Sequence, residues 1–177
     1  MIERTVKIVE PDKGRHIAIS NDINTILASK EDTGGTYSIL EIKVFPNGGP
    51  LPHIQTHEHE GFYIIEGQIV FNVNGKRIEA TPGTFVNVPP GIVHSFKNEK
   101  DKVVKMIVVL SPPGMEQLFV KAGIEISDNY VKPPPFDEKQ KQKLVNMFPK
   151  YGIKLQWQSQ KFLHLQEAHV LIHLIKN

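Results

Sequence analysis

The sequence predicts an all-β fold of many short strands, followed by helical segments. Runs rich in Val, Ile, Phe and Tyr recur over the first two-thirds of the 177-residue chain, and clusters of glycine and proline separate them. The asparagine–glycine pair at positions 74–75 is typical of a tight β-hairpin. Many short strands at close spacing indicate a β-sandwich or barrel, the class that includes the jelly roll.

Turn residues define the expected strands. Asn74 and Gly75 tolerate the positive φ angles of a type I′ turn, so the flanking runs should pair as a hairpin. Further breaks occur at Gly34–Gly35, at Pro46–Gly49 and at Pro89–Gly91. In chain order, the expected strands are 16–20, 24–29, 36–45, 62–66, 68–73, 76–80, 84–88, 94–97 and 103–110.

The character of the chain changes after residue 111, where prolines and a glycine end the last strand. A short helix is expected over 115–123, with Leu118, Phe119 and Ala122 on one face. Asp137 is a suitable N-cap for a second helix that runs to about residue 150. Its apolar face consists of Leu144, Val145 and Phe148.

The last segment, 156–177, is apolar but has mixed periodicity; a helix from residue 161 onward is one interpretation. We expect a single domain overall, with a β-barrel and its N-terminal strands in 1–114 and a helical extension in 115–177 that packs on the barrel. We expect a homodimer, in which residues 1–20 or the apolar segment 156–177 cover exposed sheet edges.

Composition narrows the range of functions. Apolar residues make up 40% and charged residues 23% of the chain, which is ordinary for a globular protein. The formal net charge is +2 and basic residues form no stripe, so we expect neither nucleic-acid nor membrane binding. There is no cysteine, which excludes disulfides, thiolate catalysis and cysteine-bound metal. Any metal must therefore take nitrogen or oxygen ligands.

Two features bear on localisation. The first seven residues lack the apolar run of a secretory signal. The most apolar strand, 103–110, is too short to cross a bilayer and contains Lys105. We therefore expect a cytoplasmic protein.

Histidine and glutamate side chains in two separate clusters predict a metal site. His53, Gln55 and His57 share one face if the strand is regular, because alternate residues point the same way. A turn near 58–61 lets Glu60 rejoin that face, and His94 arrives from a distant strand. Donors of this kind suit one divalent ion of iron, manganese, nickel, cobalt, copper or zinc, with open positions for a small-molecule substrate or dioxygen.

The identity of the ligands depends on position 55. An amide oxygen such as that of Gln55 is neutral and a weaker donor than imidazole. His57 could replace it, but it lies roughly 7 Å further along a regular strand and would need a bulge. A third alternative is a weak site formed by His53, Glu60 and His94 alone. His59 is expected to face away, towards solvent or an interface.

Alternation predicts an apolar interior around these donors, which favours an aromatic or hydrophobic substrate over a sugar phosphate. For each residue taken alone, ordinary core packing is the expected role. The candidate pocket residues are Phe45, Phe62, Ile64, Phe71, Val86, Val88, Phe96, Met106 and Val108.

The two clusters resemble the two signature motifs of the cupin superfamily. The second, G-x5-P-x-G-x2-H-x3-N, is matched at every fixed position from Gly83 to Asn98. The first, H-x-H-x(3,4)-E-x6-G, is matched at its first histidine, its glutamate and its glycine, with Gln55 at the second histidine position. The resemblance extends over about residues 15–155 and is to small single-domain bacterial cupins similar to quercetin 2,3-dioxygenase. It implies a jelly-roll β-barrel, also called a double-stranded β-helix.

The resemblance also implies a function. In a quercetinase-like dioxygenase, a metal beside His53 and His94 would hold an enolisable aromatic substrate, and Glu60 would act as the general base. Gln55 at a ligand position favours a different class, a non-catalytic small-molecule-binding or structural cupin with a degenerate site. A metal-dependent isomerase or hydrolase is a further alternative, because one fold carries many reactions.

Overall fold

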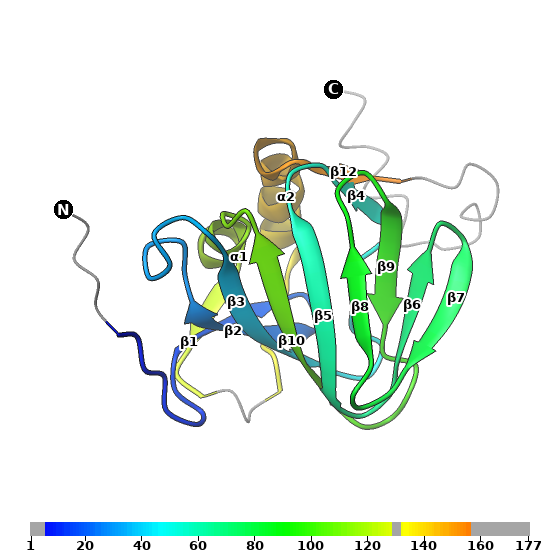
Figure 1. Cartoon of the computed structure of the whole chain (residues 1–177), viewed down its shortest axis with the longest axis horizontal. Coiled ribbons are helices and arrows are strands. Elements are labelled where there is room, and N and C mark those ends of the chain that lie inside the picture. Colours follow the sequence, from blue (N-terminus) through cyan, green and yellow to red (C-terminus); the bar gives the residue numbers. More distant parts are fainter. Residues whose placement is uncertain (1–5, 129–131, 157–177) are drawn as a thin grey trace.

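Two antiparallel sheets pack face to face and enclose the core. The structure is a computed structural model that describes residues 6–128 and 132–156. Within this part of the chain, the strands form a seven-stranded sheet and a five-stranded sheet (Figure 1). The prediction of an all-β, jelly-roll fold is therefore confirmed.

The larger sheet has the strand order β11-β1-β2-β3-β10-β5-β8, and the smaller sheet has the order β12-β4-β9-β6-β7. The larger sheet consists of β1 (Arg15–Ile19), β2 (Asp22–Ala28), β3 (Ser38–Val44), β5 (His59–Glu66), β8 (Phe85–Val88), β10 (Val104–Ser111) and β11 (Ile124–Ile126). The smaller sheet consists of β4 (His53–Gln55), β6 (Ile69–Val73), β7 (Lys76–Ala80), β9 (Val93–Lys97) and β12 (Ile153–Leu155).

Each predicted strand is present, with ends that shift by up to three residues. The hairpin between β6 and β7 turns at Asn74 and Gly75, whose φ angles are 49° and 80°. The sequence did not predict β11 and β12. Both are three residues long, too short for a periodic pattern, and they form by pairing with β1 and β4.

The helices follow the sequence signals. Helix α1 (Glu116–Ala122) buries Leu118 and Ala122, and it packs against α2 (Glu138–Met147). Asp137 caps α2 in a reciprocal capping box, and a short 3-10 helix, η1 (Phe148–Tyr151), continues it. No helix among the described residues is long and apolar enough to cross a membrane. The prediction of a helix beyond residue 161 falls outside the described residues.

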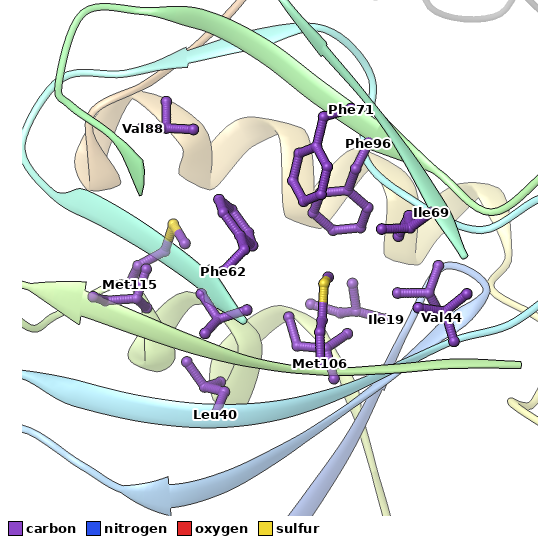
Figure 2. Close-up of a cluster of buried hydrophobic side chains, with 14 of the residues drawn as sticks. Ile19, Leu40, Val44, Phe62, Ile69, Phe71, Val88, Phe96, Met106 and Met115 are labelled. Carbon is purple, nitrogen blue, oxygen red and sulfur yellow. The ribbon is translucent and has the colours of Figure 1, made fainter. Parts of the chain in front are cut away.

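Aromatic rings dominate the core between the sheets. Phe62 and Phe71 have ring centroids 5.2 Å apart, and Phe96 lies 5.7 Å from each of them (Figure 2). The predicted interior residues pack here, except Phe45, which is half-buried and outside the cluster. The interior residues in the buried cluster are Phe62, Ile64, Phe71, Val88, Phe96, Met106 and Val108, and Val86 packs against it.

Asn98, the last residue of the second motif, fixes the loop that leads into β4. Its side chain is fully buried, and its amide nitrogen donates to the carbonyl oxygens of Val44 and Lys102 at 2.9 and 2.8 Å. Its amide oxygen accepts from the Lys100 N–H, and its carbonyl oxygen accepts from the Asn47 N–H. Asn98 therefore has a structural role, and it holds the approach to His53.

Asp22 holds the same loop from the other side. Its carboxylate accepts a hydrogen bond from the Gly49 N–H at 3.1 Å, and a side chain at Gly48 would collide with it. The residue is only 7% exposed, and one carboxylate oxygen has no hydrogen-bond partner. Burial raises the pKa of Asp22 from its ordinary 3.8 to about 7.

Asp22→Asn should flatten the pH dependence of stability. Folded protein keeps the Asp22 proton up to about pH 7, whereas unfolded protein loses it near pH 3.8, so the folded state binds more protons between these values. The contribution of Asp22 to stability therefore falls as the pH rises through this window. We expect Asp22→Asn to remove a decline on the order of 3 kcal/mol. Urea unfolding near pH 4.5 and pH 7.5 measures it; equal declines in both proteins would refute the assignment.

Candidate metal centre

Three ligand-bearing side chains from both sheets meet in the interior. His53 on β4 and His94 on β9 are directly paired neighbours in the smaller sheet. Glu60 comes from β5 of the larger sheet. One ligand atom from each residue lies within 4.8 Å of the others. His53 is 8% exposed, His94 1% and Glu60 3%. The three predicted donors His53, Glu60 and His94 are thus brought together and could hold a metal ion.

The strand pattern explains why Glu60 points inward. The chain leaves the smaller sheet after Gln55 and joins the larger sheet at His59. Alternation along β5 then exposes His59 and Tyr63 and buries Glu60 and Phe62. The turn between the sheets thereby resets the register as the sequence predicted.

Backbone carbonyl groups orient both imidazoles in the same way. The Nδ1 atom of His53 is 2.9 Å from the carbonyl oxygen of Leu51, and Nδ1 of His94 is 3.0 Å from that of Ile92. Since a carbonyl oxygen can only accept, Nδ1 carries the proton in each ring. The neutral imidazole then has its lone pair on Nε2, the atom left to bind a metal.

His94 and Glu60 form a buried polar contact at the centre of the site. Nε2 of His94 is 2.8 Å from Oε2 of Glu60. Both atoms are nevertheless buried without a properly oriented hydrogen bond. The close distance without hydrogen-bond geometry is expected of two ligand atoms directed at a common third atom.

Burial and charge shift the pKa values of the two histidines in opposite directions. Burial alone would lower the pKa of His94, but contact with Glu60 and its negative charge outweigh burial and raise that pKa. Burial, and then the charge of His94, lower the pKa of His53. His53 therefore loses its second proton more readily than His94, whose charged form is favoured by the neighbouring carboxylate.

The donor set fits a divalent transition metal. Two imidazole nitrogens and one carboxylate oxygen form the facial arrangement known for such ions, with positions left open. Leaving buried polar atoms unpaired costs stability, and a cation between Glu60 and His94 would satisfy both.

Gln55 is next to the group but its amide is engaged elsewhere. The side chain is 1% exposed, its nitrogen donates to the Met115 sulfur at 3.0 Å, and its oxygen accepts from the Thr56 N–H at 2.8 Å. That Gln55 is a fourth ligand stays a prediction.

His57, the suggested substitute for Gln55, is not brought into the group. Strand β4 ends at Gln55, so His57 falls in the following turn, where it is exposed and close to Gly152. His59 is also exposed, as expected.

Glu58 is a buried acid that the sequence pattern did not single out. It is 4% exposed, and one of its carboxylate oxygens has no hydrogen-bond partner. Burial, reinforced by the charges of Glu60 and Glu116, raises the pKa of Glu58 to about 7. It lies in a turn between two exposed histidines, a context that gives no sign of burial.

Comparisons with known proteins agree with this architecture. A family model described as "Cupin domain" matches residues 40–110, a range that contains His53, Glu60 and His94. Quercetin 2,3-dioxygenase of Bacillus subtilis (strain 168) is 27% identical over 116 residues, covering 66% of this chain and 34% of that protein. The chain thus spans about a third of that relative. Polyketide synthase CurC of Streptomyces cyaneus is 24% identical over 108 residues, with coverage of 60% and 67%.

Solved structures share the fold. A predicted oxalate decarboxylase from Thermotoga maritima superposes with a TM-score of 0.56 and 24% identity, over 59% of this chain and 98% of that one. KdgF from Halomonas gives a TM-score of 0.56 and 13% identity, over 64% and 98%. Residues 40–110 of this chain form a cupin domain, since the complete second motif, the double-sheet fold and the family match all agree.

Proposed function

We propose that the protein is a metal-dependent, dioxygenase-like enzyme that acts on a small aromatic or enolisable molecule. One observation carries the proposal: His53, Glu60 and His94 converge from two sheets with buried ligand atoms and with both imidazoles oriented for binding through Nε2. The similarity to a quercetin 2,3-dioxygenase supports this choice of reaction class.

The side chains have distinct tasks in this proposal. When bound, a divalent ion would supply Lewis acidity and, for a redox-active metal, electron transfer. His53, Glu60 and His94 would hold it, and the carbonyl groups of Leu51 and Ile92 fix the two imidazole rings. Glu60 accepts the hydroxyl proton of the substrate as general base, a task that requires hydrogen-bond reach of the substrate oxygen.

An aromatic substrate is favoured by the surroundings of the donors. The ring of Phe62 lies 6.4 Å from that of His94, and Phe71 and Phe96 extend the aromatic cluster. Apolar surroundings of this kind favour an aromatic or hydrophobic ligand over a strongly charged one.

A non-catalytic cupin is the second candidate. It is favoured by the contacts of Gln55, whose amide is engaged by Met115 and Thr56 rather than by the three donors. A site with reduced affinity for metal could bind a small molecule without catalysing its conversion.

Metal content tests the site itself. We expect tag-free protein to hold about one equivalent of a divalent transition metal, and His94→Ala to bind it at least tenfold more weakly, because a ligand is removed. Exposed His57 provides the matched control: His57→Ala should bind like the wild type. The measurement is inductively coupled plasma mass spectrometry after dialysis; equal losses in both variants, or no metal in the wild type, would disprove the site.

Oxygen consumption tests the reaction. The metal-loaded protein should take up dioxygen with a flavonol or another enolisable aromatic compound. Glu60→Gln should lower kcat per bound metal by about 10²–10⁴-fold, because the amide cannot accept the proton. An oxygen electrode records the rate, and metal content is determined on the same sample. Stoichiometric metal without oxygen uptake on any such compound would favour the non-catalytic candidate.

A further inference from the structure

Gln55 occupies a position in β4 from which it would be expected to reach the metal. It lies two residues beyond His53, on the same inward side of the strand, and is almost fully buried. Both ends of its amide nevertheless have partners outside the group His53, Glu60 and His94.

The orientation of the amide follows from its neighbours. The Thr56 N–H faces the oxygen of Gln55 at 2.8 Å and also donates to the carbonyl oxygen of Gly152. If the amide were flipped, so that its oxygen and nitrogen changed places, its NH2 group would face the Thr56 N–H. Both groups are donors, so the flipped orientation is unfavourable. The oxygen, the only side-chain atom of Gln55 able to bind a metal, is therefore directed at the backbone N–H of the next residue.

Met115 holds the other end of the amide. Its sulfur accepts from the Gln55 nitrogen at 3.0 Å, and the residue is 6% exposed at the start of α1. Fully buried Glu116 anchors this end of the helix, because its carboxylate accepts from the N–H groups of Lys30 and Gly114. The position of Met115 is thus set by the helix and not by β4, β5 and β9, the strands that carry the three donors.

We propose that Met115 keeps Gln55 out of the coordination sphere, so that the metal has three protein ligands. Met115 is a positioning residue in this arrangement, since it acts through Gln55. With His53, Glu60 and His94 as the only protein donors, a bound divalent ion would keep positions open for substrate, dioxygen or water. The inference rests on the proposed metal site and specifies its coordination.

Cobalt binding to four proteins tests the proposal: the wild type, Gln55→Leu, Met115→Leu and the double variant. Gln55→Leu should leave the cobalt Kd within about threefold, because no ligand is lost. Met115→Leu preserves the volume and removes the acceptor, so the freed amide can turn to the metal. We expect about three- to tenfold tighter binding and a weaker visible absorption per cobalt, which indicates a higher coordination number. Neither change should occur when Gln55 is also replaced.

A tenfold loss of cobalt affinity in Gln55→Leu alone would overturn the proposal, because it would identify Gln55 as a ligand. So would an effect of Met115→Leu that persists without Gln55. His57→Ala serves as the control for general damage near β4.

A metal-free measurement separates this proposal from the proposed function. Urea unfolding of the four apoproteins gives the coupling between positions 55 and 115, and the contact predicts non-additive losses of stability. If the wild type binds no cobalt, the metal-dependent function fails. Non-additive losses then still support the Gln55–Met115 contact, and strictly additive losses overturn it.

Discussion

The pairing of β4 with β9 is the constraint on which the site depends. Strand β4 has three residues, yet it places His53 directly opposite His94 and is supported on its other edge by β12. The Gly91 N–H also donates to the carbonyl oxygen of Gln55, so the turn of the second motif is fixed to the strand of the first. Because β4 is so short, these neighbours, more than its own length, keep the two imidazoles together.

Around this pairing the fold buries several groups that normally prefer water. Asp22 and Glu58 are buried acids with raised pKa values, and Glu60 and His94 meet without a hydrogen bond. Each carries a desolvation cost that the aromatic core must offset. Asp22 holds the loop before β4, whereas a cation bound in the proposed site would give Glu60 and His94 a partner. The buried polar groups thus have different roles: one is structural, and the central pair is suited to ligand binding.

Helix α1 gives the site a connection beyond the two sheets. Glu116 joins its start to the loop after β2, and Met115 joins it to β4. Side chains at the start of the helix therefore contact the strand that carries His53, although they belong to neither signature motif. In the proposed metal site they would act through the position of Gln55, a route that ligand spacing does not reveal.

The sequence by itself determined the strand pattern and the hairpin at Asn74–Gly75, because these follow from local turn chemistry and alternation. It also predicted the grouping of His53, Glu60 and His94, through the order and spacing of its two motifs. Only the tertiary structure decided the surroundings of Gln55, His57 and Glu58. Their contacts depend on where β4 ends and on the return of α1 and β12 to the barrel, long-range packing that no local pattern encodes.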